Sequence, residues 1–207
     1  MSVKPQVEVF ADITCPFTHV GLRTVAGAVA DIDPDIELRM RAWPLEWVNA
    51  SPTPADMVGA EILALREQAG IDAFEGFDPD TWPTTTIPAH NLAAAAYDKD
   101  SRTGLRVSLA VRDALFEDGL DVSDVDVLAR LAADHGLETP SPEPVASVEA
   151  DYAEGTRRGV RGSPDFWVGS DEFFCPALTV EHDESGFTVG FDNDGLQRFL
   201  ARLGSLS

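Results

Sequence analysis

The sequence places a cysteine at the junction between a strand and a helix. The apolar, β-branched run of residues 7–14 ends at Cys15, and the helical pattern of residues 16–30 starts directly after it. A helix N-terminus carries unsatisfied N–H groups and about half a positive charge, so a thiol there is expected to have its pKa lowered from about 8.5 to about 3.5–7.5. Pro16 suits the first helical turn, where no backbone donor is needed. Cys15 is therefore the candidate nucleophile, with a small buried hydrophobic residue as the alternative.

The order of elements around this cysteine indicates an α/β fold. Apolar and alternating patterns predict strands over residues 6–11 and 36–43 on either side of the helix over residues 16–30. Prolines and glycines then separate segments of helical spacing, which predict four further helices over residues 55–69, 90–97, 105–117 and 125–134. The chain thus opens with a β-α-β unit and continues with a helical centre.

The last third of the chain returns to a mixed pattern. A helix is predicted first, followed by two short apolar runs. The Gly and Asp residues between these runs are typical of a turn and indicate a hairpin. A second, more exposed hairpin follows around the turn at residues 183–186, and an amphipathic helix ends the pattern. These elements cover residues 145–158, 166–168, 172–175, 178–182, 187–191 and 194–203. The full order is β-α-β, a helical block, then α-β-β-α with the second hairpin as an addition before the last helix.

Several segments resemble the disulfide-bond-forming oxidoreductase A (DsbA) family. Residues 12–21, with Cys15 and Pro16 at the start of the helix, are similar to that family's active-site strand and helix, where Cys-Pro begins a CxxC motif. Residues 89–93 are similar to the start of the family's inserted helices, and residues 159–166 to the loop that carries a cis-proline, here Pro164. The order and spacing of these segments extend the resemblance over nearly the whole chain.

This resemblance implies a thioredoxin-like fold with an inserted α-helical domain and an extra C-terminal β-hairpin. Residues 1–50 and 145–207 are expected to form the thioredoxin-like domain, and residues 51–144 the inserted domain. It also implies that Ser163 and Pro164 hold extended backbone beside Cys15, where a peptide or tripeptide thiol could pair as an added strand. Phe17 is expected at the same binding surface, and Arg161 is the nearest cation for a substrate carboxylate.

One departure from the family pattern changes the expected chemistry. Thr18 stands where the oxidoreductases of the family have their second cysteine, so a CxxC disulfide cannot form. A single thiolate can still attack a disulfide and form a mixed disulfide with a small thiol, or accept a hydrogen bond from a bound thiol. Thr18 lies three residues along the helix from Cys15, so its hydroxyl could face the sulfur. An ordinary helix-surface threonine is the alternative.

Three more residues are candidates for the site. His19 could donate to the thiolate, although adjacent helix positions point about 100 degrees apart. Cys175 is expected at the active-site end of the sheet, either paired with Cys15 or as a buried inert thiol. Relatives that use glutathione carry a glycine and an acidic residue near this point, whereas residues 175–177 read Cys-Pro-Ala. Asp12 opens the active-site segment.

Composition narrows the expected partners. The chain has 15 basic and 36 acidic side chains among 207 residues, a formal net charge of -21, so nucleic acid and anionic membranes are not expected to bind. No apolar run is long enough for a membrane span, and two cysteines without an export signal suggest a reducing cytoplasm. No metal-ligand spacing occurs, and no tightly bound cofactor is expected. The partner expected is a small-molecule thiol or disulfide, glutathione-like or another; a monomer and a homodimer both stay open.

Three functions are compatible with these residues. The first is a DsbA-like thiol-disulfide oxidoreductase or thiol transferase with Cys15 as nucleophile and a low-molecular-weight thiol completing the cycle. The second is a thiol-dependent isomerase or transferase resembling 2-hydroxychromene-2-carboxylate isomerase or kappa-class glutathione transferase. The third is a binding module that keeps the fold without turnover. The pH dependence of Cys15 alkylation separates the first two from the third, because an activated nucleophile titrates below about 8.5.

Overall fold

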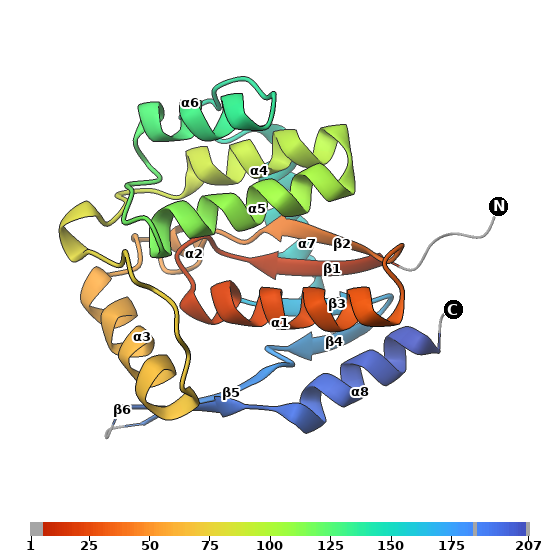
Figure 1. The fold of residues 1–207 in the computed structure, drawn as a ribbon. Helices are drawn as coiled ribbons and strands as arrows, with labels where there is room; N and C mark the ends of the chain where they lie inside the picture. Colours follow the sequence, from red (N-terminus) through yellow and green to blue (C-terminus); the bar gives the residue numbers. More distant parts are fainter. Residues whose placement is uncertain (1–5, 184–185, 206–207) are drawn as a thin grey trace.

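The computed structural model describes residues 6–183 and 186–205, which alternate between strands and helices (Figure 1). In chain order the elements are β1 (Gln6–Ala11), α1 (Pro16–Ile32), β2 (Glu37–Ala42), α2 (Leu45–Val48), α3 (Ala55–Ala69), the 3-10 helix η1 (Pro79–Thr81), α4 (Ile87–Lys99), α5 (Ser101–Phe116), α6 (Val125–Asp134), α7 (Ala146–Arg158), β3 (Asp165–Val168), β4 (Asp171–Phe174), β5 (Leu178–Asp183), β6 (Gly186–Phe191) and α8 (Asn193–Gly204). The predicted α/β class is confirmed.

Four strands form the main sheet, in the order β2-β1-β3-β4. β1 and β2 are parallel, with Gln6 opposite Glu37 and Ala11 opposite Ala42. β3 runs antiparallel to β1 and forms the predicted hairpin with β4. Because β1 and β2 run the same way, the segments that follow both strands leave the sheet at one end. Cys15 follows β1 and therefore lies at that end.

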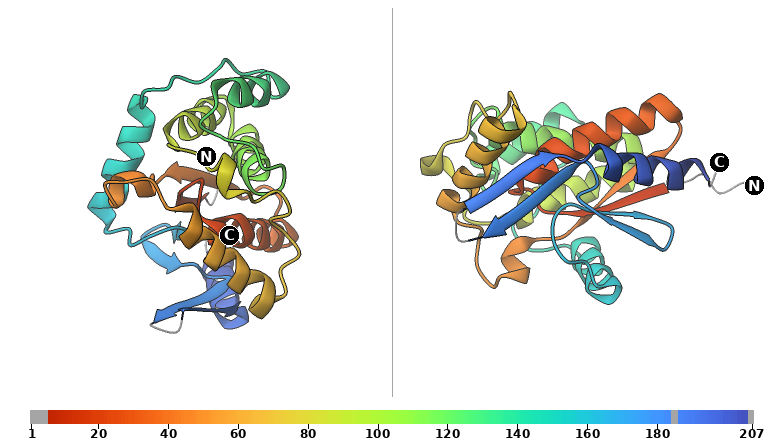
Figure 2. Two further views of the ribbon diagram at one scale, coloured as in Figure 1. Left: turned by 90° about the vertical axis from the view of Figure 1, so that its left-hand side faces the viewer. Right: turned by 90° about the horizontal axis from the view of Figure 1, so that it is seen from below.

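The two faces of the main sheet are covered by different helices. Alternate residues of β1 point to opposite faces, as the period of a strand requires. On one face β1 packs against α1 and α8, through a core of Val7, Val9, Ala11, Leu22, Val25, Val29, Phe199 and Leu203. On the other face Phe10 packs with Trp43, Val160 and Trp167, and Tyr152 of α7 lies against them. The two views of Figure 2 show α1 and α8 on one side of the sheet and α7 on the other.

The helices α2 to α6 and the 3-10 helix η1 lie between β2 and α7 in the chain. Asp100 begins α5 by accepting a hydrogen bond from the backbone N–H of Thr103 at 2.8 Å, and Gly70 ends α3 in the left-handed conformation that favours glycine. One hydrophobic core runs from these helices into the start of α1, through residues such as Leu92, Val111 and Val20. The division into a thioredoxin-like domain and an inserted domain at residues 51 and 144 stays a prediction.

The C-terminal hairpin forms a second sheet. β5 and β6 pair with each other in antiparallel register, with Leu178 opposite Phe191, and β6 packs against α3. The extra C-terminal β-hairpin is therefore confirmed, although part of its predicted turn, residues 184–185, lies outside the described residues. The hairpin and α3 gather at the end of the main sheet where β1 ends and α1 begins (Figures 1 and 2).

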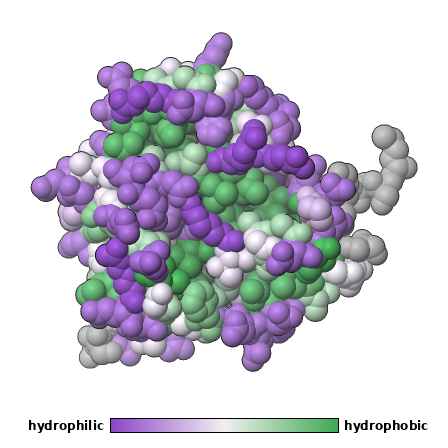
Figure 3. All heavy atoms as spheres, viewed as in Figure 1, coloured by the Kyte–Doolittle hydropathy of each residue, from purple (hydrophilic) through white to green (hydrophobic). Residues whose placement is uncertain are grey.

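Hydrophilic and hydrophobic side chains both reach the face of the molecule seen in Figure 1. Figure 3 shows hydrophilic side chains over the face of the molecule seen in Figure 1, with smaller hydrophobic areas between them. Within residues 6–183 and 186–205, no helix has the length and apolar character needed to cross a membrane. The same ranges contain no group of three or more His, Cys, Asp or Glu side chains arranged to hold a metal ion.

Candidate active site

A buried carboxylate fixes the loop between β1 and α1. Asp12 is fully buried, and its side chain accepts hydrogen bonds from the backbone N–H of Thr14 at 2.7 Å and of Leu45 at 3.0 Å. The Thr14 hydroxyl also donates to this carboxylate, and a ring nitrogen of His90 lies 3.4 Å from it. Asp12 therefore ties the segment before Cys15 to the segment after β2 and to α4.

Cys15 caps the start of α1. Its backbone is extended, Pro16 takes the first helical position, and the sulfur donates a hydrogen bond to the backbone carbonyl of Ser163, with Sγ and O 3.0 Å apart. Proline is well suited there because it has no N–H to leave unpaired. The peptide bond between Ser163 and Pro164 is cis. The structure thus brings the sulfur directly against the loop before β3.

Thr18 and Ser163 lie beside the sulfur. Their hydroxyl oxygens are 2.8 Å apart, and the backbone N–H of Asp12 donates to the Ser163 hydroxyl at 2.9 Å. Thr18 is completely buried, so it is not a surface threonine. Both its hydroxyl and its backbone N–H favour the ionised form of Cys15. Its side chain therefore faces the sulfur and the Ser163 loop together.

Cys15 lies in the wall of a cavity of about 330 Å³. Residues from the α1 start, α2, α3, β4, β5 and β6 line it: Thr14, Cys15, Phe17, Leu45, Thr53, Met57, Glu61, Gly162, Ser163, Phe174, Cys175, Val180 and Phe187. Cys15 is only 5% exposed, but its remaining surface opens on this cavity rather than into the packed core. The cavity lies where α3 and the β5–β6 hairpin cover the end of the sheet (Figure 1).

The expected low pKa of Cys15 is wrong for this structure. Burial raises the pKa of the Cys15 thiol to about 11, and the nearby carboxylate of Glu61 contributes in the same direction. Hydrogen bonds from Thr18 and Ser163 lower the pKa but are outweighed. A position at a helix N-terminus therefore does not by itself produce a thiolate here, because the sulfur is removed from water and faces a carboxylate.

This result predicts a specific pH profile for alkylation of Cys15. In a Cys175→Ser variant, the rate of reaction with iodoacetamide should keep rising with pH and reach half its maximum near pH 11, because only the thiolate reacts. Short pulses followed by intact-mass measurement give the rate, and the Cys15→Ser variant gives the background. A rate that levels off below pH 8 would contradict the raised pKa.

His19 is directed away from the sulfur. Its Nε2 donates to the Glu117 carboxylate at 2.6 Å, and its Nδ1 accepts from the Arg23 guanidinium at 3.1 Å. Burial, and then the charge of Arg23, lower the pKa of His19 to about 4, so the ring is neutral at pH 7. The suggestion that His19 donates to the Cys15 thiolate is wrong, because both ring nitrogens are already engaged elsewhere.

Cys175 and Arg161 occupy different positions relative to the cavity. Cys175 lines it, and its thiol is free, as is that of Cys15. Burial raises the pKa of Cys175 to about 12, with the charge of Cys15 contributing next. Arg161 lies outside the lining: it pairs with Glu172 at 2.8 Å, and its guanidinium carbon lies 5.4 Å from the centre of the Phe174 ring. Its assignment to a substrate carboxylate has no support from its position.

Glu61 is the lining residue of most consequence that the sequence reasoning missed. Glu61 lies on α3 together with Met57, and both line the cavity that Cys15 lines. A signal was present: Glu61 falls between the buried residues Val58, Ile62 and Leu65 at helical spacing, so it occupies the apolar face of α3. A charged residue on such a face invites a functional explanation.

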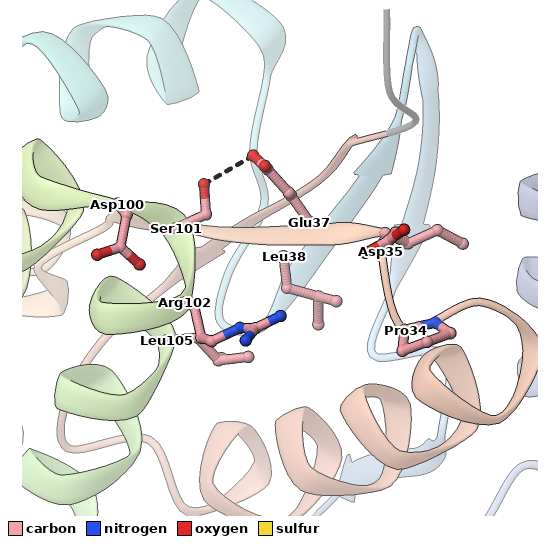
Figure 4. A pocket seen from close by; sticks show the side chains of 9 residues that line it. Pro34, Asp35, Glu37, Leu38, Asp100, Ser101, Arg102 and Leu105 are labelled. Atoms are coloured by element: carbon pink, nitrogen blue, oxygen red, sulfur yellow. Dashed lines mark hydrogen bonds between the residues drawn. The ribbon is translucent and has the colours of Figure 1, made fainter.

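A second hollow has a different character. It holds about 220 Å³ between the start of β2 and the start of α5, and it is lined by polar and charged side chains such as Glu37, Asp100 and Arg102 (Figure 4). Ser101 donates a hydrogen bond to Glu37 at 2.7 Å across it. It contains no cysteine or histidine, and it lies at the end of β2 opposite to the one near Cys15. The nucleophile therefore belongs to the first cavity.

This arrangement of sheet, helices and N-terminal cysteine defines a thioredoxin-fold protein. The family model described as "DSBA-like thioredoxin domain" matches residues 6–203, so the chain belongs to the DsbA-like thioredoxin family. The family resemblance and the thioredoxin-like fold expected from the sequence are confirmed. A relative from Bacillus subtilis (strain 168), "Uncharacterized protein YwbO", is 25% identical over 142 residues, which cover 65% of this chain and 68% of the relative.

Solved structures of several kinds share the fold. The cytosolic disulfide reductase DsbM from Pseudomonas aeruginosa superposes with a TM-score of 0.62 at 16% identity, covering 98% of this chain and 100% of DsbM. A structure of DsbM with GSH gives 0.59 at 15% identity, covering 96% and 99%. A 2-hydroxychromene-2-carboxylate isomerase gives 0.63 at 15% identity, covering 97% and 95%. At these identities the likeness establishes the fold, which disulfide oxidoreductases and an isomerase both use.

Proposed function

We propose that this protein is a DsbA-like thiol-disulfide oxidoreductase or thiol transferase that works through the single nucleophile Cys15. The observation that carries the proposal is the position of the Cys15 sulfur, at the start of α1, against Ser163 and in the wall of a 330 Å³ cavity. Membership of the DsbA-like family supports it. In this proposal Pro16 and Thr18 complete the reactive segment, and Phe17, Ser163 and Pro164 contact the substrate.

The proposed chemistry consists of two thiol–disulfide exchanges. The first forms a mixed disulfide on Cys15, and the second transfers that disulfide to another thiol. The Cys15 thiol loses its proton to solvent, and the thiolate attacks one sulfur of a disulfide RS–SR, forming Cys15–S–S–R and releasing RS⁻, which takes up a proton. A low-molecular-weight thiol then attacks the R-side sulfur, forms a new disulfide and restores Cys15. Thr18 supports this one-thiol cycle, because no second cysteine stands at that position of the helix.

The position of Thr18 stabilises the reacting sulfur in this proposal. Its hydroxyl and its backbone N–H both favour the thiolate, so they would hold negative charge on Cys15 as the sulfur ionises or leaves. The glutathione complex of the neighbour DsbM supports a small thiol as the partner class. Cytoplasmic location, the lack of nucleic-acid and membrane partners, and the choice between monomer and homodimer stay predictions.

A second candidate is a thiol-dependent isomerase. One observation favours it: the Cys15 thiol is protonated at pH 7 and already acts as a hydrogen-bond donor to Ser163. A protonated thiol could hold a cofactor thiol without reacting with it, and a neighbouring structure is an isomerase of this fold. A serine at position 15 would keep such a role and would lose the redox role.

Intact-mass measurement after incubation with bis(2-hydroxyethyl) disulfide tests the proposal. The wild-type protein should gain one mercaptoethanol adduct, and so should Cys175→Ser, whereas Cys15→Ser should gain none. Cys175 serves as the matched control because it lines the same cavity and has a similarly buried thiol. An adduct that persists in Cys15→Ser and disappears in Cys175→Ser would transfer the reactive role to Cys175.

A further inference from the structure

The charge in the cavity comes from one carboxyl group. Among the described residues that line the cavity, Glu61 is the sole charged side chain; the others are apolar, such as Met57 and Phe187, or neutral and polar, such as Thr53. The side chain of Glu61 makes no hydrogen bond or ion pair with any residue in the described ranges 6–183 and 186–205. Glu61 is half-buried, and a carboxyl group partly removed from water without a partner is costly, so a cationic ligand would stabilise it.

Cations near the cavity are engaged elsewhere. Arg161 pairs with Glu172 outside the lining. Arg112 is buried behind the Cys15 loop and donates to the backbone carbonyls of Asp12 and Ser108, both at 2.8 Å. Within the part of the chain that the structure describes, no arginine or lysine lines the cavity. The negative charge of Glu61 in the cavity is therefore not neutralised by a positively charged side chain of the described lining.

Glu61 also acts on the sulfur. Burial raises the pKa of Glu61 to about 7, and its charge is one of the causes that raise the pKa of Cys15. A positive group placed against Glu61 would cancel that repulsion and so favour the Cys15 thiolate. A cationic substrate would thus increase the reactivity of the sulfur that attacks it, whereas an anionic one would be repelled.

We propose that Glu61 determines the substrate class: the site takes a thiol or disulfide with an apolar body and a positively charged group, which lies against Glu61 while its sulfur meets Cys15. This inference rests on the proposed single-thiol function. An anionic tripeptide such as glutathione is then a poor substrate, because its carboxylates would meet the Glu61 carboxylate in a cavity without a basic side chain.

Methanethiosulfonate reagents of different charge test this inference. Each reacts by the same step, in which the Cys15 thiolate attacks the alkylthio sulfur of the reagent, forms a disulfide with it and breaks its bond to the sulfonyl group, so that methanesulfinate leaves. Aminoethyl, methyl and sulfonatoethyl reagents supply a positive, a neutral and a negative group. In a Cys175→Ser background at pH 8, we expect the cationic reagent to react about tenfold or more faster than the anionic one, since a carboxylate a few ångströms away gives an effect of that order.

Two variants on α3 distinguish the effect of Glu61 on the reaction rates from the effect of the overall charge of the chain. Glu61→Gln should bring the cationic and anionic rates several-fold closer and should raise the neutral rate, because the repulsion on the thiolate is gone. Glu67→Gln removes one charge from an exposed position on the same helix and should leave all three rates unchanged. Equal rate ratios in the two variants, or a fall of the neutral rate in Glu61→Gln, would overturn the inference.

The same reagents distinguish failure of this inference from failure of the function on which it rests. If the neutral reagent modifies wild-type Cys15 but charge selectivity does not depend on Glu61, the single-thiol function stands and the substrate class is wrong. If none of the three reagents modifies folded wild-type protein at Cys15, the proposed function itself is wrong. Melting curves of each variant show that the protein measured is folded.

Discussion

Replacing Asp12 by alanine is expected to lower the free energy of unfolding by about 3–5 kcal/mol, the range for removing one partner of a buried charged network. The variant leaves the backbone N–H groups of Thr14 and Leu45 buried without an acceptor, since both donate to this carboxylate. His90 also loses its contact with Asp12. Urea denaturation followed by circular dichroism measures the loss.

Two further variants control this prediction. Asp98→Ala changes an exposed aspartate and should alter the free energy of unfolding by no more than about 0.5 kcal/mol. Asp12→Asn keeps an acceptor oxygen and should cost less than Asp12→Ala. If Asp12→Ala were as stable as Asp98→Ala, Asp12 would not be the residue that fixes the loop before Cys15.

Asp12 also predicts a dependence of stability on pH. Burial alone would raise its pKa, but the hydrogen bond and charge of His90, with hydrogen bonds from Thr14 and Leu45, hold the pKa below the usual 3.8. A carboxyl group with a lowered pKa stabilises the folded state above pH 3.8, and this contribution is lost as the pH falls through the lower folded value. The difference in free energy of unfolding between the wild-type protein and Asp12→Asn, measured by urea denaturation, should therefore shrink as the pH falls below 3.8.

Gly104→Ala is expected to destabilise the protein by about 1–3 kcal/mol or more through overpacking. An added Cβ would lie 2.2 Å from Cδ1 of Tyr97, well inside contact distance. Tyr97 cannot withdraw freely, because its buried hydroxyl accepts from the backbone N–H of Met40 at 2.9 Å and donates to the carbonyl of Leu38 at 3.2 Å. Urea denaturation again measures the effect.

Gly27→Ala is the matched control for this prediction. Gly27 lies on the exposed side of α1, and a Cβ there meets no atom within 4 Å. The substitution should stabilise the protein by about 0.5–1 kcal/mol, because alanine favours a helix more than glycine does. The two substitutions are expected to change the free energy of unfolding in opposite directions. A stabilising Gly104→Ala would contradict the packing of α5 against Tyr97.

Local patterns were enough to predict most of the fold. The strand before Cys15 and the helix after it have clear apolar periods, and the structure has β1 at Gln6–Ala11 and α1 at Pro16–Ile32. The short helix α2 was missed, since four residues after Pro44 are too few to show a helical period. The β5–β6 hairpin was predicted, but its separation from the main sheet could not be foreseen, because that depends on contacts with distant segments such as α3.

The site was only partly predictable from the sequence. The resemblance to the DsbA family implies that Ser163 lies beside Cys15 and Thr18, and the structure brings these residues together. Glu61 was not foreseen, because its approach to the sulfur depends on how α3 packs over the end of the sheet. The pKa of Cys15 differs from the value that the sequence predicts for the same reason: the helix N-terminus is visible in the sequence, whereas burial and a nearby carboxylate are tertiary properties.

In the proposed function one sulfur, with an external thiol, carries the whole cycle. The most direct measurement is the fate of the wild-type mixed disulfide after excess reagent is removed and before any thiol is added. We predict that the intact mass keeps the adduct until a small thiol is supplied, and that Cys15 and Cys175 are both free afterwards. Spontaneous loss of the adduct with formation of a Cys15–Cys175 disulfide would contradict this account and make Cys175 the resolving thiol.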